Sequence, residues 1–153
     1  MDREIILASH GKFASGILDS LELIYGKNHS ITVLDCYTDE NFDLAETVRQ
    51  LFMRYKDKEI IVLTDLFGGS VNNEFLQYIN RDHVYLVAGL NLPLLIELVS
   101  RLDAEVETTV LIQQVLTDSK KMIQFCNANQ HGPYIRGDTR VTMAWTKGGH
   151  LAT

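Results

Sequence analysis

Residues 4–17, EIILASHGKFASGI, contain the change of local structure from which the fold can be predicted. A short apolar run, EIILA, is followed by Ser9, His10 and Gly11, and then by a segment with helical spacing. Such a run is typical of a buried strand, and a glycine permits a tight turn into a helix. Most histidines in globular proteins do no chemistry, so the place of His10 in the fold must decide its role.

Four apolar runs of this kind alternate with longer amphipathic segments. They are nearly continuous in Ile, Val and Leu, which favours a parallel sheet covered by helices on both faces. The runs lie at residues 4–8, 31–37, 59–64 and 84–88. Strict alternation of strands and helices implies right-handed crossovers. We therefore predict a doubly wound, mainly parallel α/β sheet, with the strand order 2-1-3-4 of flavodoxin-like folds.

Five helices are expected between and after these strands. The fifth begins near Asp103. The first four are recognised by their apolar stripes, which are Leu18, Leu21 and Ile24; Leu44, Val48, Leu51 and Tyr55; Phe75, Leu76 and Ile79; and Leu95, Leu98 and Val99. Gly26 is expected to end the first helix, Asn41 to cap the second and Ser70 to cap the third. Pro93 lies in the first turn of the fourth.

The end of the chain has a different pattern. Residues 120–127, KKMIQFCN, alternate as an antiparallel edge strand does, although the fifth helix could also continue through them. Beyond residue 129 the sequence is rich in turn residues, with a short β-like run, RVTMAW, at 140–145. We accordingly expect a domain at 1–127 and a C-terminal tail at 128–153.

The composition excludes several classes of protein. The 153 residues are 46% hydrophobic, enough for a substantial core, and the net charge of −6 argues against nucleic acid or an anionic membrane as a partner. No apolar run approaches the roughly 20 residues of a membrane span, and the N-terminus lacks a signal-peptide pattern. Cys36 and Cys126 have no zinc or redox spacing, so we expect reduced thiols in a cytoplasmic protein.

Ligands of doubly wound sheets bind beyond the carboxyl ends of the strands. Of the five histidines, only His10 directly follows a strand. His29 and His83 precede strands, and His131 and His150 belong to the tail. His10 is therefore the histidine expected at the reactive edge.

The loop DLFGGSVN at residues 65–72 follows the neighbouring strand and ends at the same edge. Asp65 can accept the proton of one ring nitrogen of His10, which fixes the tautomer and turns the other nitrogen outward. Gly68 and Gly69 allow backbone amides to approach an anion, and Ser70 adds a hydroxyl at a helix start. The turn at Gly11, which leads into the first predicted helix, offers a second possible anion-binding position.

Each of these residues taken singly could serve only a turn or a cap. Their meeting at one edge favours an anion site beside a nucleophilic histidine. No GxxxxGK[ST], GxGxxG or GxSxG motif is present, so nucleotide binding and serine hydrolysis lack a signature. A metal site formed by His10 with Asp35 or Asp65 stays open, although its ligands are few.

Three segments, IILASHGKFASGI (5–17), VLTDLFGGSVNN (62–73) and VAGLNLPLLIEL (87–98), together resemble the enzyme IIA domain of the mannose family of the bacterial sugar phosphotransferase system. The similarity keeps the family's order and spacing and extends to about Asn127. It implies a phosphotransferase component with a phosphohistidine intermediate and no cofactor or metal. His10 would accept a phosphoryl group from the phosphorylated histidine-containing phosphocarrier protein and pass it to enzyme IIB. Asp65 would orient the ring, and Ser70 would contact the phosphate.

The resemblance also implies a homodimer, often with a C-terminal edge strand exchanged between subunits, and residues 120–127 occupy that position. Membrane components would be contacted only indirectly, and the transported sugar cannot be read from a carrier domain. Family members often continue into a fused enzyme IIB, so the end of this chain suggests a separate one. Val71 departs from the family, which usually has proline there, but valine still permits the helix start.

Phe13 and Phe67 flank the two loops and are candidates for apolar anchors of partner proteins. Both could equally be core residues, since phenylalanine is commonly buried. Other functions also stay open: the related phosphoryl-transfer subunit of dihydroxyacetone kinase, a small metal chelatase using His10, or a non-catalytic binding module.

Overall fold

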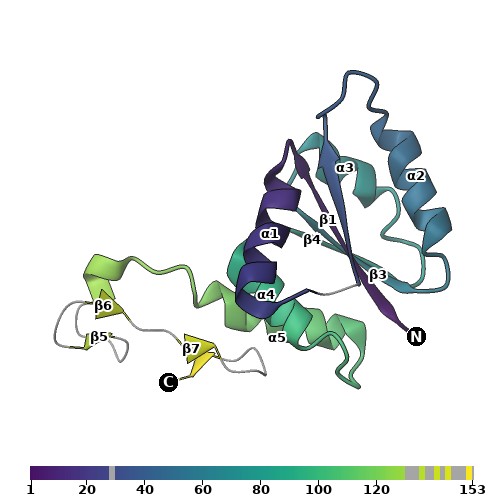
Figure 1. The fold of residues 1–153 in the computed structure, drawn as a ribbon. Coiled ribbons are helices and arrows are strands. Elements are labelled where there is room, and N and C mark those ends of the chain that lie inside the picture. The colour runs from purple at the N-terminus through teal and green to yellow at the C-terminus, as the bar shows by residue number, and fades with distance from the viewer. Residues whose placement is uncertain (28–29, 130–134, 137–139, 142–143, 146–150, 153) are drawn as a thin grey trace. The chain divides into compact units, whose positions relative to one another are not determined.

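The computed structural model describes residues 1–27, 30–129, 135–136, 140–141, 144–145 and 151–152. The chain forms two compact units, Met1–Leu92 and Pro93–Thr153 (Figure 1). The boundary expected between residues 127 and 128 stays a prediction. His29, His131 and His150 lie outside the described residues.

The first unit contains a parallel sheet of four strands. They are β1 (Arg3–His10), β2 (Ile31–Cys36), β3 (Glu59–Thr64) and β4 (Val84–Ala88). Their order is β2-β1-β3-β4, which confirms the predicted topology. In this register Ala8 of β1 lies opposite both Leu34 of β2 and Thr64 of β3. The residues that follow these positions therefore leave the sheet at one edge.

Helices cover both faces of this sheet. α1 (Phe13–Tyr25) lies on one face, whereas α2 (Leu44–Arg54) and α3 (Ser70–Leu76) lie on the other (Figure 1). The core against α2 and α3 consists of Ile6, Ala8, Cys36, Val48, Phe52, Ile60, Val62, Val71 and Phe75. The central strands β1 and β3 are buried on both faces, which explains why their sequences are continuously apolar.

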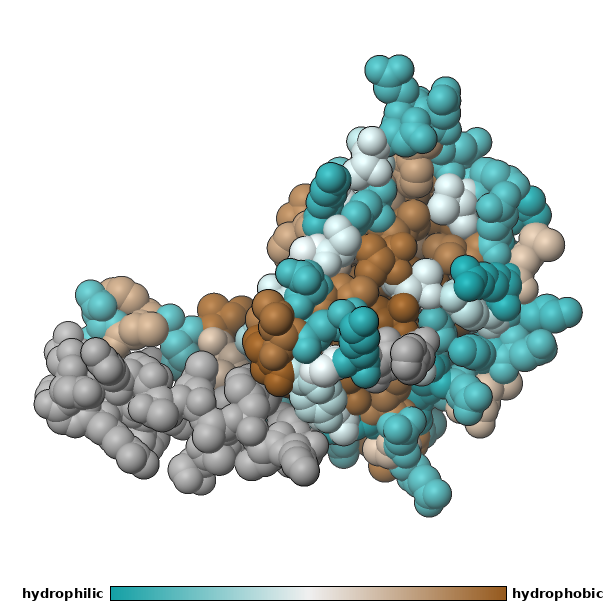
Figure 2. Space-filling view, in the orientation of Figure 1, coloured by the Kyte–Doolittle hydropathy of each residue, from teal (hydrophilic) through white to brown (hydrophobic). Residues whose placement is uncertain are grey.

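The surface of the first unit is mixed in character. Figure 2 shows hydrophilic side chains over α2 and the loops at the periphery, with hydrophobic side chains visible where β1 and β2 lie in Figure 1. No described helix is long and apolar enough to cross a membrane.

The second unit contains α4, which starts at the boundary (Leu92–Ser100), and α5 (Thr108–Lys120). The guanidinium of Arg101 donates to Glu97 at 2.5 Å and to Asp118 at 2.7 Å, joining the end of α4 to α5. A 3-10 turn, η1 (Cys126–Asn129), follows. Two antiparallel pairs come last, formed by two-residue strands: β5 (Ile135–Arg136) with β6 (Arg140–Val141), and β7 (Ala144–Trp145) with β8 (Leu151–Ala152).

The helix starts differ from those expected. The N-cap of α2 is Asp43 rather than Asn41, because the Asp43 carboxylate accepts the amide of Glu46 at 3.1 Å. The N-cap of α3 is Gly69, so Ser70 is the first helical residue. α5 starts five residues after Asp103, because residues 101–104 close a turn first.

Two predicted helix ends can also be compared with the structure. Gly26 is the C-cap of α1, as expected, with a positive φ of 90°. α3 stops at Leu76, so Ile79 is not part of its apolar stripe and lies exposed instead.

The expected edge strand at residues 120–127 is not formed among the described residues. The amides of Lys121 and Met122 donate to Asp118 and Ser119, so the end of α5 tightens into a turn before η1. The helix therefore does not continue through the segment either. Exchange of this segment between two subunits stays a prediction.

The two candidate caps of α2 can be separated by experiment. Asp43→Ala should lower the free energy of unfolding by about 1 kcal/mol, because the Glu46 amide loses its acceptor. Asn41→Ala should change it by less than about 0.5 kcal/mol, as an exposed loop substitution does. Urea unfolding of both variants measures this. Equal losses would contradict the assignment of Asp43 as the cap.

Candidate functional site

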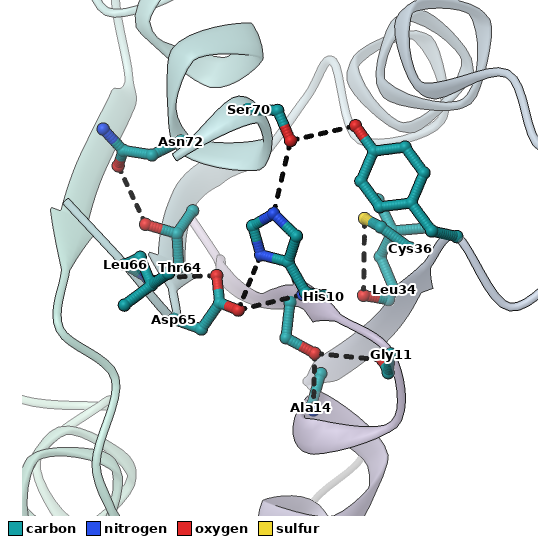
Figure 3. Close-up of polar contacts among 12 residues, drawn as sticks. His10, Gly11, Ala14, Leu34, Cys36, Thr64, Asp65, Leu66, Ser70 and Asn72 are labelled. Carbon is teal, nitrogen blue, oxygen red and sulfur yellow. Dashed lines mark hydrogen bonds and ion pairs between the residues drawn. The ribbon is translucent and has the colours of Figure 1, made fainter. Parts of the chain in front are cut away.

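His10 and Asp65 meet at the carboxyl edge of the sheet (Figure 3). His10 is the last residue of β1, and Asp65 directly follows β3. The Nδ1 atom of His10 lies 2.9 Å from Asp65 Oδ2, and the same oxygen accepts the backbone amide of His10 at 2.9 Å. This pairing of neighbouring strands fixes both the position and the rotation of the ring. The geometry is the one expected from the two loop sequences.

Asp65 is ionised at neutral pH. Burial raises its pKa, but hydrogen bonds from the amide and ring of His10 and from the Leu66 amide outweigh this, and the pKa is held below its usual range. An ionised carboxylate only accepts hydrogen bonds, so Nδ1 of His10 must carry a proton. In the neutral ring, Nε2 therefore keeps its lone pair.

Nε2 of His10 faces Ser70. The Ser70 hydroxyl lies 3.3 Å from Nε2 (Figure 3). The hydroxyl of Tyr37 in turn donates to Ser70 Oγ at 2.9 Å. Ser70 was a sequence candidate, but Tyr37 was not. Tyr37 could have been found from its position in the sequence, because it directly follows β2 and so lies at the same edge of the sheet as His10.

The start of α3 approaches the His10 ring closely. A Cβ atom on Gly69 would lie 3.2 Å from Cε1 of His10, so a larger residue here would press on the ring. Gly68 has a φ of +77°, which favours glycine. The buried Thr64 hydroxyl donates to Asn72 at 2.8 Å and holds α3 against the end of β3.

Several amides in the turn at Gly11 and in the first turn of α1 donate to acceptors within the protein. The Gly11 amide donates to the carbonyl of Cys36 at 2.8 Å. The Ala14 amide donates to the Ser9 hydroxyl at 2.8 Å, and the Ser15 amide donates to Asp35 at 3.0 Å. The start of α1 therefore offers an anion fewer free amides than its sequence suggested. The Asp35 carboxylate thus serves as an acceptor for the first turn of α1, whose N-cap is Lys12.

Cys36 is not a competing nucleophile. It is buried at the end of β2, and burial together with the charge of Asp65 raises its pKa to about 12. The side chain stays a thiol at neutral pH, whereas a thiolate is needed for nucleophilic attack. The His10 side chain, by contrast, is accessible, with 41% of it exposed.

Exposed apolar side chains occur in the segments that follow His10 and Asp65 along the chain. Phe67 is 88% exposed and Phe13 48%, so neither is a core residue. Leu66, between Asp65 and Phe67, is also exposed. Exposure is what an anchor for a partner protein requires, and the anchor role itself stays a prediction.

The remaining candidates lie elsewhere or do not converge. His83 precedes β4, and its carbonyl accepts the Ile60 amide at the opposite edge of the sheet. Within the described ranges, no three His, Cys, Asp or Glu side chains form a group that could hold a metal ion. Asp65 and Ser70 do converge on His10 (Figure 3), and Gly69 lies close to its ring.

Comparison with known proteins identifies relatives of the chain. The family model EIIA-man, described as the PTS system fructose IIA component, matches residues 4–116. The fructose-specific EIIA component of Bacillus subtilis (strain 168) is 26% identical over 126 residues, which cover 80% of this chain and 86% of that protein. The sorbose-specific EIIA component of Klebsiella pneumoniae is 30% identical over 95 residues, which cover 61% of this chain and 70% of that protein.

A solved structure is more similar still. It is described as a permease of the phosphoenolpyruvate-dependent sugar phosphotransferase system from Klebsiella pneumoniae subsp. pneumoniae MGH 78578. It superposes with a TM-score of 0.80 at 48% identity, covering 83% of this chain and 93% of that one.

Proposed function

The chain belongs to the mannose and fructose IIA family of the sugar phosphotransferase system, and we propose that it is a cytoplasmic phosphoryl carrier that uses His10. His10 accepts the phosphoryl group of the phosphorylated histidine-containing phosphocarrier protein and then passes it to enzyme IIB. The observation that carries this proposal is the orientation of the ring, with Nδ1 bonded to Asp65 and Nε2 directed outward.

The orientation suits phosphoryl transfer between two histidines. The lone pair of Nε2 attacks phosphorus while the bond between phosphorus and the donor's ring nitrogen breaks, and the donor ring keeps that electron pair. Nε2 carries no proton in the neutral ring, so no base is needed at this step. Asp65 keeps Nδ1–H in place and performs no chemistry itself.

The transferred phosphoryl group brings negative charge close to Asp65. The Ser70 hydroxyl and the first amides of α3 are the groups placed to offset that repulsion. Gly69 supports this role, because its missing side chain lets the helix start lie against the ring. Gly11 and Gly68 shape the adjacent turns.

Partner proteins would dock on the apolar surface around His10. Phe13, three residues after His10, and Phe67, two residues after Asp65, offer exposed rings, and aromatic side chains commonly dominate the energetics of interfaces. The sugar stays unspecified, since relatives of the chain are named for both fructose and sorbose.

The carrier would act as a homodimer. Ile123 and Phe125, within the predicted exchanged segment, are 78% and 72% exposed in the single chain. Two large apolar side chains in one short segment are expected to be covered by a partner surface. A second copy of the chain would supply it.

Labelling tests the assignment of His10. With enzyme I, phosphocarrier protein and radiolabelled phosphoenolpyruvate, the chain should acquire one acid-labile label, which His10→Ala should abolish. His83→Ala is the matched control, since that histidine lies at the opposite edge, and it should keep full labelling. Label on the His10→Ala variant would contradict the assignment. No label on the wild type, together with metal binding, would favour a chelatase.

Asp65→Ala should stay folded and be phosphorylated more slowly without losing phosphorylation. A hydrogen bond to a charged group is worth on the order of 1.5–3 kcal/mol, so transfer should slow roughly ten- to a hundredfold. Rapid-quench kinetics measure the rate, and circular dichroism checks folding. An unchanged rate would mean that Asp65 has only a structural role in its turn. Complete loss in a folded variant would mean that it does more than orient the ring.

Light scattering tests the dimer. The chain should scatter as twice its 17.3 kDa mass, and replacing Phe125 by a charged residue should shift it towards the monomer. A monomer mass for the wild type at working concentrations would contradict the proposal.

A further inference from the structure

Tyr37 has an unusual backbone conformation beside the site. Its φ is +64°, and the only other described non-glycine residue with positive φ is His83, at the opposite edge. Bulky side chains rarely adopt this region, and such a conformation persists only where other contacts hold it. Asn, Asp or Gly would fit this turn with less strain. A tyrosine here therefore calls for an explanation from its side chain.

The side chain of Tyr37 contacts the site. Its hydroxyl donates to Ser70 Oγ at 2.9 Å, its ring centroid lies 5.7 Å from that of His10, and Phe42 packs edge-on against it at 5.4 Å. About half of the side chain is exposed, so burial alone does not account for the residue.

We propose that Tyr37 is a positioning residue that acts on His10 through Ser70, a role that rests on the proposed function. Each hydroxyl has one proton to donate. Because Tyr37 donates to Ser70 Oγ, the Ser70 proton is free to point at Nε2 of His10. At the other side of the ring, Asp65 accepts the proton of Nδ1. The hydrogen bond from Ser70 to Nε2 and the hydrogen bond from Nδ1 to Asp65 thus favour the same tautomer of His10, with the lone pair on Nε2.

The same arrangement can serve the phosphorylated state. As the bond between Nε2 and phosphorus forms and the donor's nitrogen–phosphorus bond breaks, Nε2 stops accepting a hydrogen bond. The Ser70 proton can then turn to a phosphoryl oxygen, while Tyr37 continues to hold Ser70 Oγ. No proton is transferred in this step. The role of Tyr37 is to keep the Ser70 hydroxyl oriented before and after phosphoryl transfer.

Tyr37→Phe removes the hydroxyl and keeps the ring and its backbone. Phosphorylation of this variant should slow roughly three- to tenfold, the range expected for a neutral hydrogen bond. Tyr78→Phe is the matched control, because it removes a hydroxyl from a ring that stacks on Phe52 outside this chain of contacts, and its rate should not change. In a Ser70→Ala background, Tyr37→Phe should have no further effect. An unchanged rate in the single variant, or the same slowing in the Ser70→Ala background, would overturn the proposal.

Nitrogen NMR of the unphosphorylated, ¹⁵N-histidine-labelled chain gives a readout that does not depend on activity. The Nε2 resonance of His10 should move in Ser70→Ala towards that of a nitrogen accepting no hydrogen bond, and partway in the same direction in Tyr37→Phe. Tyr78→Phe should leave it in place. A resonance unmoved by Tyr37→Phe would overturn the role of Tyr37 alone, whereas a wild-type chain that takes no label would overturn the proposed function.

Discussion

One carboxylate oxygen ties the site to the sheet. Oδ2 of Asp65 accepts both the backbone amide and the Nδ1 proton of His10. This double contact is available because β1 and β3 are parallel neighbours in a register that pairs Ala8 with Thr64. A shift of one residue would turn the histidine to the other face. The strand pairing in the core thereby determines which ring nitrogen meets the solvent, and the rest of the site is arranged around that nitrogen.

Packing then determines how close the other groups come. The missing side chain of Gly69 lets the start of α3 lie against the ring, and the hydrogen bond between Thr64 and Asn72 holds that helix end in place. At the start of α1 the protein's own acceptors, Ser9 and Asp35, take the amides that a ligand could have used. The two turns that the sequence suggested as anion-binding positions thus differ in the amides they can offer an anion.

The strand order and the meeting of His10, Asp65 and Ser70 could be predicted, because residues that directly follow parallel strands share an edge. The features that were missed depend on tertiary contacts, which residue type alone does not reveal. Asp43 and Asn41 are equally good caps by composition, and only the path of the chain selects between them. Tyr37 gives no signal by residue type, since its role comes from a positive φ and a contact with α3. The segment at 120–127 alternates like a strand, but its first amides bond to carbonyls at the end of α5 and so form a turn instead.

The nitrogen that bears the phosphoryl group tests the central claim most directly. The chain labelled with ¹⁵N-histidine can be phosphorylated and examined by phosphorus and nitrogen NMR, in which coupling between the two nuclei identifies the bonded ring nitrogen. We expect phosphorus on Nε2 of His10, with Nδ1 still protonated by virtue of its bond to Asp65. Phosphorus on Nδ1 would contradict the claim that Asp65 holds that nitrogen and directs the other to the donor.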